Sequence, residues 1–252
     1  MANRSDEVAE LNLLEMPAAA AMHGIHTLEL CHFHFPSVDA SYLDQLRRAV
    51  VDAEAELFSI LVDTGDISHA DPGVRATDMA TIRGWIDIAA ELEAGHVRII
   101  AGDSDPGTNA IERSVSGLLE LAAYAEARGV ATLTENFKQL AARPETCIRI
   151  LNRCEGRVGL CADFGNFPVP TRSQDLTQIL PRAASVHAKA EYRSGVMERQ
   201  DYLVHVGLAA SADFDGPISL ICQDADDVWG RILELKKATE EAWVSRELGE
   251  SQ

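Results

Sequence analysis

Apolar positions along the chain follow two alternating patterns. Compact runs rich in Val, Ile, Leu and Cys are typical of strands. They lie at residues 26–33, 57–66, 96–104, 132–137, 159–167, 185–192 and 217–224. Between these runs the apolar residues recur at helical spacing, as over 16–24, 77–92, 110–128 and 226–248. Because strands that alternate with helices form βαβ units, the pattern predicts a parallel sheet covered by helices.

Seven strands in 252 residues are too many for two separate α/β domains. They suit a (β/α)8 TIM barrel with one strand unaccounted for. The shortfall is at the N-terminus, where only residues 11–14 precede the first predicted helix. We therefore predict a barrel whose first strand is short or incomplete. No linker or low-complexity tract interrupts the pattern, so residues 1–252 are predicted to form one domain.

The excess of acidic residues in the chain restricts the classes of partner that it can bind. The sequence carries 40 Asp and Glu against 22 Lys and Arg, which gives a formal net charge of −18. A nucleic-acid binder usually presents a basic face to the phosphates, and no Lys/Arg cluster of that kind occurs in the sequence. We therefore expect a small-molecule ligand and no nucleic acid.

Neither the apolar runs nor the cysteines indicate export or a membrane. No run reaches the roughly 18 apolar residues of a membrane span, and residues 1–17 lack the apolar segment of a signal peptide. The five cysteines form no CxxC pair, which indicates buried free thiols in a reducing compartment. These observations predict a cytoplasmic protein that does not associate with membranes.

Polar residues close nearly every predicted strand. The active sites of (β/α)8 barrels lie at the C-terminal ends of the strands, so these residues form the candidate site. They are Glu29, His32, His34, Asp63, Asp66, Asp103, Glu135, Asn136, Asp163, Asn166, His187, Lys189, Gln223 and Asp224.

The strongest subset is Glu135, Asp163 and His187, which follow apolar runs on three successive strands. Two carboxylates and an imidazole offer a divalent cation two oxygen ligands and one nitrogen ligand, a mixture that suits Mn²⁺, Mg²⁺, Co²⁺ or Zn²⁺. Such a cation polarises a carbonyl group. Each residue taken alone also has a structural explanation, as a cap or a hydrogen-bonded residue of the barrel. The three together favour a metal site.

Six short motifs, in this order along the chain, carry a resemblance to a known family. They are GIHTLELC, HVRIIAGDS, GVATLTENF, VGLCADFGNFP, SVHAKAEY and FDGPISL. Over about residues 16–224 the sequence resembles the sugar phosphate isomerase/epimerase family, the xylose isomerase-like TIM barrels that include ketose 3-epimerases. The resemblance implies a metal held by a Glu, an Asp, a His and a second Glu, and it places Glu135, Asp163 and His187 on the first three positions. It also places Arg193 on an arginine that some epimerases use near the metal and the substrate.

Two positions depart from the pattern of that family. Asn166 stands where a His commonly follows the Asp by three residues, and an Asn still hydrogen-bonds a sugar hydroxyl. Ile221 stands where the closing Glu is expected, and an Ile neither binds a metal nor moves a proton. The two-base epimerase mechanism that the resemblance implies therefore lacks one base. Gln223 has the same strand parity and offers a neutral oxygen, but it cannot act as a base.

Three interpretations follow. The one we predict is an isomerase or epimerase of a small sugar or related polyhydroxy carbonyl compound, with Glu135 as base and Lys189, His34 or a metal-bound water as second proton carrier. The alternative is a catalytically impaired barrel that binds a sugar-like ligand without turnover, and Ile221 favours it. The third is a phosphodiesterase of the endonuclease IV type, which needs more metal ligands and tolerance of DNA, so the charge of −18 counts against it.

Further strand-end residues are candidates for contact with the substrate. Lys189 is more typical of an anion contact than of a Schiff-base nucleophile, and Glu29 is either a pocket carboxylate or the partner of an interior cation such as Lys189. The predicted substrate-binding residues are Glu29, His32, His34, Asp103, Asn166, Arg193 and Gln223. The sequence leaves sugar and sugar phosphate both open, and only the resemblance implies a homo-oligomer.

Overall fold

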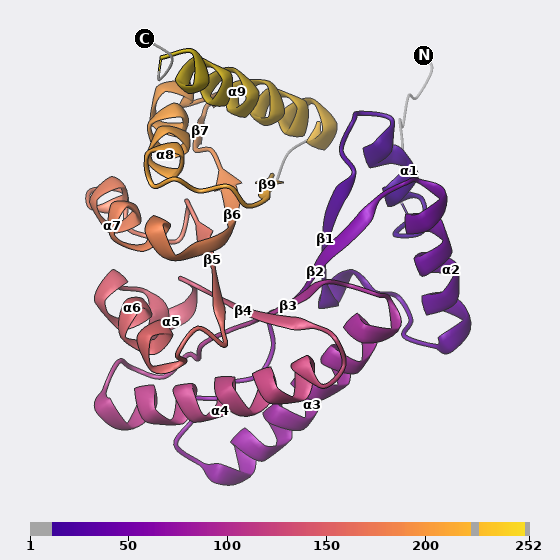
Figure 1. The fold of residues 1–252 in the computed structure, drawn as a ribbon, viewed down its shortest axis with the longest axis vertical. Helices are drawn as coiled ribbons and strands as arrows, with labels where there is room; N and C mark the ends of the chain where they lie inside the picture. Colours follow the sequence, from indigo (N-terminus) through magenta and orange to yellow (C-terminus); the bar gives the residue numbers. More distant parts are fainter. Residues whose placement is uncertain (1–11, 223–226, 250–252) are drawn as a thin grey trace, which may run out of the picture.

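Parallel strands form the centre of the molecule. The computed structural model describes residues 12–222 and 227–249. Within them, seven parallel strands follow the order β1-β2-β3-β4-β5-β6-β9 and curve into a nearly closed barrel (Figure 1). They are β1 Thr27–Cys31, β2 Glu56–Val62, β3 His96–Ile99, β4 Ala131–Glu135, β5 Gly159–Asp163, β6 Ala183–Lys189 and β9 Ile218–Ile221. The predicted TIM barrel is confirmed.

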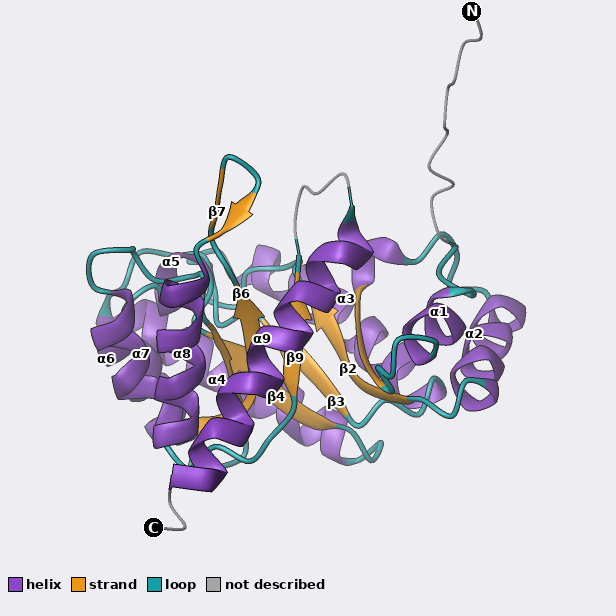
Figure 2. Cartoon of the chain, turned by 90° about the horizontal axis from the view of Figure 1, so that it is seen from above, coloured by secondary structure: helices purple, strands orange, loops and turns teal. Residues whose placement is uncertain are grey.

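Helices surround the barrel on its outside (Figures 1 and 2). The α-helices are α1 Met16–Ala21, α2 Ala40–Asp52, α3 Pro72–Glu91, α4 Thr108–Glu126, α5 Lys138–Ala141, α6 Pro144–Arg153, α7 Arg172–Ile179, α8 Arg199–Ser211 and α9 Val228–Gly249. The chain also forms two 3-10 helices in its described part, η1 His32–His34 and η2 Leu180–Arg182. A hairpin of β7 Tyr192–Arg193 and β8 Val196–Met197 projects beyond the end of β6 (Figure 2).

The barrel has a seam between β1 and β9, which stand at the two ends of the hydrogen-bonded order. Leu13 and Leu14 lie in a turn, so the described part of the short first strand predicted over 11–14 is not a strand; residue 11 lies outside the described residues. The rings of His23, just after α1, and Trp229 of α9 are 4.6 Å apart between centroids. This contact joins the first and last helical segments.

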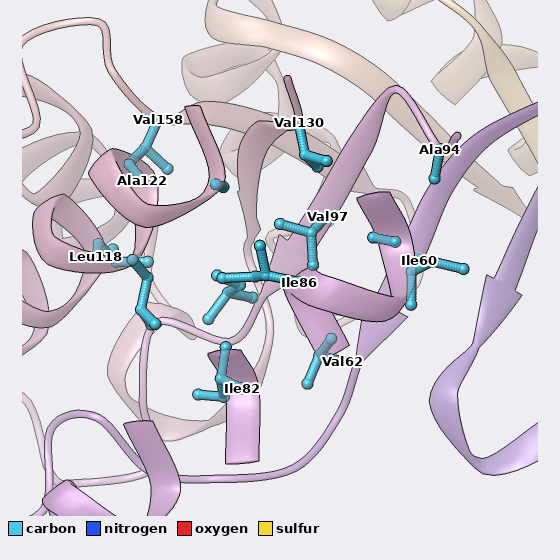
Figure 3. Close-up of a cluster of buried hydrophobic side chains, with 14 of the residues drawn as sticks. Ile60, Val62, Ile82, Ile86, Ala94, Val97, Leu118, Ala122, Val130 and Val158 are labelled. Atoms are coloured by element: carbon cyan, nitrogen blue, oxygen red, sulfur yellow. The ribbon is translucent and has the colours of Figure 1, made fainter. Parts of the chain in front are cut away.

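Apolar side chains pack between the strands and the helices. Ile60 and Val97 of the strands and Ile82 and Ile86 of α3 belong to one buried cluster (Figure 3). Because successive side chains of a strand point to opposite faces, Arg98, next to Val97, points into the barrel. The outward positions therefore build the core, and the inward positions are free to build a site.

The helix predicted over 77–92 begins earlier than its periodicity indicates. The structure places the start of α3 at Pro72, with Asp71 as its N-cap. The Asp71 carboxylate accepts hydrogen bonds from the backbone N–H of Gly73 at 2.7 Å and of Val74 at 3.3 Å. Asp followed by Pro is a helix-start signal, and it places the start of the helix five residues before the predicted range.

The first predicted strand, 26–33, is longer than β1, which ends at Cys31. His32 and His34 belong instead to the 3-10 helix η1, in which Phe35 N–H contacts the His32 carbonyl at 3.4 Å. The prediction that the strand continues through residues 32 and 33 is therefore wrong, and neither His32 nor His34 lies on a strand.

Cys31, Cys147, Cys154 and Cys161 are buried free thiols, and Cys222 is half-buried. Within the described ranges, none of the helices combines the length and apolar character needed to cross a membrane.

Candidate functional site

The C-terminal halves of three neighbouring strands carry polar side chains that face the interior of the barrel. Glu135 ends β4, Asp163 ends β5, and His187 lies on β6. In the parallel register Asp163 is paired with His187, and Glu135 with Cys161. Residues paired in this way lie at one level and point to the same face, so the ends of the strands direct these side chains into one volume.

His187 lies close to both of the other predicted metal ligands, Glu135 and Asp163, and their binding of a metal stays a prediction. His187 Nδ1 lies 3.8 Å from Glu135 Oε2 and 3.7 Å from Asp163 Oδ2, and all three side chains are buried. Bonds of about 2.1 Å to one ion place adjacent ligand atoms roughly 3–3.5 Å apart. Each carboxylate thus lies near His187 Nδ1, but in the described residues the ligand atoms that all lie within 4.8 Å of one another belong to Glu135, Cys161 and His187, so Asp163 has to move toward Glu135 before the predicted set can share one ion.

The two carboxylate oxygens of this group also lack good hydrogen bonds. Within the described part of the chain, Glu135 Oε2 and Asp163 Oδ2 are buried atoms without a hydrogen-bond partner. Arg98 Nε lies 2.9 Å from the first and Lys189 Nζ 2.8 Å from the second, as ion pairs without hydrogen-bond geometry. Buried oxygens that are unsatisfied and aimed at one imidazole nitrogen fit a divalent cation.

Cys161 offers a further donor beneath this group. Its Sγ, one oxygen of Glu135 and one nitrogen of His187 all lie within 4.8 Å of one another. Burial raises the pKa of the Cys161 thiol, so in the absence of a cation it is a neutral group.

The other ring nitrogen of His187 contacts Glu29 of β1. Nε2 lies 2.8 Å from Glu29 Oε2, and both side chains are buried. Glu29 was predicted to face the substrate or to pair with Lys189, and the structure gives it His187 as partner. Burial raises the pKa of Glu29, but His187 and nearby hydrogen bonds outweigh burial and hold the pKa below its ordinary value.

Arg98 of β3 is the functional residue that the sequence analysis missed. Its buried guanidinium forms ion pairs with Asp63 and with Glu135. Burial raises the pKa of Asp63, but the attraction and the hydrogen bond of Arg98, with the smaller effects of other neighbours, outweigh burial and leave the pKa below its ordinary value. The pKa of Glu135 stays raised because burial outweighs the attraction of Arg98 and His187. A single cation inside the apolar run VRII is the signal that identifies such a residue.

Three hydrogen bonds fix the position of Asp163. Asn136 donates Nδ2–H to the Asp163 carbonyl at 3.1 Å and accepts the Asp163 N–H at 2.8 Å. Asp163 Oδ1 accepts the Gly165 N–H at 2.6 Å. Burial raises the pKa of Asp163, but His187 and Lys189 outweigh it and leave the pKa lowered. Asp163 therefore remains a carboxylate in a buried setting.

His187 is the cationic centre of the group when no metal is bound. Burial lowers its pKa, but the carboxylates of Glu29 and Asp163 hold it well above its ordinary value. The imidazole thus neutralises carboxylates that a divalent ion would otherwise neutralise.

Asn166 lies in the site but is turned toward the proposed base. Its Nδ2–H donates to Glu135 Oε1 at 2.7 Å. The hydrogen bond fixes one oxygen of Glu135 while the other faces His187. Contact of Asn166 with a substrate stays a prediction.

The remaining predicted substrate residues lie toward the rim. His32 is half-buried and accepts the Asp63 N–H at 3.2 Å through Nδ1, whereas His34 is exposed. The exposed Asp103 accepts the Gln139 N–H at 3.3 Å, away from the carboxylates of the interior. Arg193 lies in the β7–β8 hairpin, is exposed and pairs with Glu198 at 2.8 Å. Gln223 lies outside the described residues.

Ile221 occupies the barrel position that the family pattern assigns to a closing Glu. It is paired with Lys189 in the register of β6 and β9, one pleat above the pair of His187 and Ser219. The chain therefore places an apolar side chain beside the Lys189 ammonium at this level.

The whole arrangement can be compared with known proteins. Residues 17–240 match the family described as xylose isomerase-like TIM barrel. The chain belongs to this family. The family resemblance drawn from the six motifs is thereby confirmed. A search of the curated proteins gives no match.

Several solved structures share the fold over almost the whole chain. L-ribulose 3-epimerase is similar with a TM-score of 0.73 and 16% identity, covering 93% of this chain and 91% of that one. D-psicose 3-epimerase from Clostridium cellulolyticum H10, solved with D-tagatose, gives 0.70 and 16%, with 92% of each chain covered. A xylose isomerase-like TIM barrel protein from Mycobacterium smegmatis in complex with magnesium gives 0.68 and 16%, covering 92% and 88%. At these identities the likeness shows the fold alone.

Proposed function

We propose that the protein is an isomerase or epimerase of a small sugar or related polyhydroxy carbonyl compound. The observation that carries the proposal is the convergence of Glu135 Oε2, Asp163 Oδ2 and His187 Nδ1 in a buried volume at the C-terminal ends of the strands. The family supports it, since similar structures include sugar 3-epimerases and one magnesium complex.

Glu135, Asp163 and His187 are the residues that would hold a divalent cation, Mn²⁺, Mg²⁺, Co²⁺ or Zn²⁺. When bound, such a cation supplies positive charge that polarises a carbonyl and an adjacent hydroxyl of the substrate. The site offers it two anionic oxygens and a nitrogen whose ring is already hydrogen-bonded on the far side.

Glu135 acts as the base in this proposal. It removes the proton on the carbon next to the substrate carbonyl, and Asn166 keeps its Oε1 in place during the transfer. Arg98, 2.9 Å from Oε2, limits the movement of the carboxylate and screens it from Asp63. The chain thus orients its base from two sides.

Lys189 is the proposed second proton carrier. Its side chain is partly exposed above the buried His187, and its Nζ lies 2.8 Å from Asp163 Oδ2. An ammonium in this position can deliver a proton to substrate that enters from the rim, and Asp163 holds it there. Ile221, paired with Lys189 across β6 and β9, contributes only apolar surface.

The alternative is a barrel that binds a sugar-like ligand without turnover. Ile221 favours it, because this position carries neither a ligand atom nor a proton. In that case the ion pairs of Arg98 and Lys189 stabilise the interior of the barrel without a metal ion.

The deciding experiment measures metal content and turnover on the same samples. Protein purified without a His-tag is incubated with Mn²⁺, and bound metal is determined by elemental mass spectrometry for the wild type and His187→Ala. We expect about one ion per chain in the wild type and loss of that ion in the variant. The same wild-type protein, with and without chelator, is screened against aldoses, ketoses and their phosphates.

Glu135→Gln is the matched test of the base. The amide keeps the shape of the side chain but accepts no proton, so turnover is expected to fall by about 10²–10⁴-fold. Glu91→Gln, at an exposed position at the end of α3, is the matched control and should retain activity. Full activity in Glu135→Gln would remove Glu135 as the base. Sugar binding without metal or product would support the alternative.

A further inference from the structure

We propose that Glu29 is a positioning residue that sets which nitrogen of His187 is presented to the metal. This inference rests on the proposed metal-dependent function and adds to it a residue outside the predicted ligand set. It concerns the contact between Glu29 of β1 and His187 of β6, which are 158 residues apart in the sequence.

The two ring nitrogens of His187 have separate surroundings. Nε2 lies 2.8 Å from Glu29 Oε2, whereas Nδ1 faces Glu135 Oε2 at 3.8 Å and Asp163 Oδ2 at 3.7 Å. A neutral imidazole has one N–H donor and one lone-pair acceptor. Because an ionised carboxylate only accepts hydrogen bonds, Glu29 keeps the hydrogen on Nε2. The lone pair is then on Nδ1, where the two unsatisfied carboxylate oxygens converge.

Burial makes this arrangement rigid. The side chains of Glu29 and His187 are 4% and 5% exposed, so water does not compete for Nε2. Removing the acceptor leaves a buried N–H without a partner or lets the ring turn over, and each outcome weakens a ligand at Nδ1. A carboxylate hydrogen-bonded to the far nitrogen of a ligating His is a recurrent way of fixing its orientation.

The position of Glu29 in the barrel adds a second consequence. β1 and β9 stand at the ends of the sheet and are not hydrogen-bonded to one another, and β9 pairs with β6. The Glu29–His187 contact therefore connects β1 to β6 through the barrel interior, past the seam. The metal ligands on β4, β5 and β6 are tied to the first strand of the sheet by this hydrogen bond.

The test compares Glu29→Leu, which removes the acceptor, with Glu29→Gln, which keeps a neutral one. Zn²⁺ affinity is measured by competition with a chromophoric chelator, and folding of each variant by circular dichroism. We expect Glu29→Leu to bind Zn²⁺ about 10–100-fold more weakly than the wild type. Glu29→Gln should recover most of the affinity, since its side-chain carbonyl still accepts the Nε2–H.

The second readout is the nitrogen that binds the metal. In protein labelled with ¹⁵N-histidine and loaded with Zn²⁺, the His187 signals, assigned with His187→Asn, should show Nδ1 bound to zinc and Nε2 protonated in the wild type and Glu29→Gln. His96, whose Nδ1 contacts the Phe58 carbonyl at 3.2 Å, is the internal control and should not change.

The outcomes separate this inference from the proposed function. Wild-type protein that binds no Zn²⁺ overturns both. Wild-type protein that binds Zn²⁺ while Glu29→Leu binds it equally well, or a zinc-bound Nε2 in the wild type, overturns only the role of Glu29. Should Glu29→Leu fail to fold, the bound nitrogen in Glu29→Gln and the wild type decides the question alone.

Discussion

At the scale of single residues, the interior of this barrel is an arrangement of charges. Carboxylates of Glu29, Asp63, Glu135 and Asp163 face the cations Arg98 and Lys189 and the imidazole of His187. Buried charges are tolerated when each has a partner, and removal of one partner leaves an uncompensated charge. Removal of Arg98 is expected to leave two charges uncompensated, because Arg98 pairs with the carboxylates of both Asp63 and Glu135.

Arg98→Met tests this role. The substitution keeps most of the side-chain volume but leaves the buried Glu135 and the partly buried Asp63 without their cation, so the free energy of unfolding should fall by about 3–5 kcal/mol. Urea unfolding followed by circular dichroism measures the change. The double variant Arg98→Met with Glu135→Gln should regain part of the loss, because the amide carries no charge. Equal stability of Arg98→Met and the wild type would contradict a buried ion pair.

The same residues show how far sequence reasoning reaches into the site. Glu135, Asp163 and His187 were predictable because each one stands at or near the end of a run whose apolar pattern marks a strand. Arg98 was not, because the third strand was predicted to end near Asp103, whereas β3 ends at Ile99. The level of the site on this strand therefore falls on Arg98, and Asp103 lies in an exposed loop.

At the scale of elements, hydrogen bonds that the Asp66 carboxylate accepts join the loops that follow β2 and β3. Asp66 Oδ1 accepts Ser68 N–H at 2.9 Å, Ser68 Oγ–H at 2.5 Å and Asp103 N–H at 3.1 Å. The Asp66 N–H in turn donates to Asp78 Oδ2 of α3 at 2.8 Å. These bonds depend on an ionised carboxylate, so the loops at this part of the rim are sensitive to acid.

The pH dependence follows from the direction of the shift. Burial raises the pKa of Asp66, but the hydrogen bonds from Ser68 and Asp103 outweigh it and hold the pKa below its ordinary value of 3.8. The folded state therefore binds this proton less readily than the unfolded state. The stabilisation by Asp66 is complete above the ordinary value and is lost as the pH falls through the lower folded value.

Asp66→Asn should reduce the free energy of unfolding by about 1 kcal/mol at neutral pH, a figure kept low because the carboxylate is partly exposed. The difference from the wild type should stay constant from about pH 6 down to the ordinary pKa of 3.8 and shrink as the pH falls below that value. Urea titrations across this range measure it, and Asp105→Asn at an exposed position of the neighbouring loop is the control. A difference that stays constant with pH would exclude the ionised carboxylate as its source.

The order of the elements could be predicted from the sequence, but their exact ends could not. The period of apolar positions gave all seven strands of the sheet, since core packing imposes that period. Local capping then shifted the ends, as Asp71 and Pro72 did for α3 and as the 3-10 turn of His32–His34 did for β1. The two-residue strands of the β7–β8 hairpin are too short to carry a period.

At the scale of the whole molecule, the seam between β1 and β9 and the net charge of −18 both bear on metal binding. A cation held by Glu135, Asp163 and His187 would join three strands, and the hydrogen bond of Glu29 to His187 would extend that connection to β1. Binding to the folded state alone raises the stability of the entire barrel by mass action. An acidic surface also attracts divalent ions without a specific site, so thermal stability alone does not separate the two effects.

The prediction for Mn²⁺ therefore depends on a matched variant. At about 100 times the dissociation constant, specific binding adds about 2.7 kcal/mol, which for a chain of this length corresponds to an increase in Tm of roughly 5–11 °C. His187→Ala retains nearly the same surface charge but lacks the nitrogen ligand, so it should show only the small non-specific increase. Differential scanning calorimetry of both proteins, with Mn²⁺ and after chelator, measures the contrast. Equal increases in the two proteins would assign the stabilisation to the acidic surface, and an increase with a sugar but not with Mn²⁺ would favour the barrel that binds without turnover.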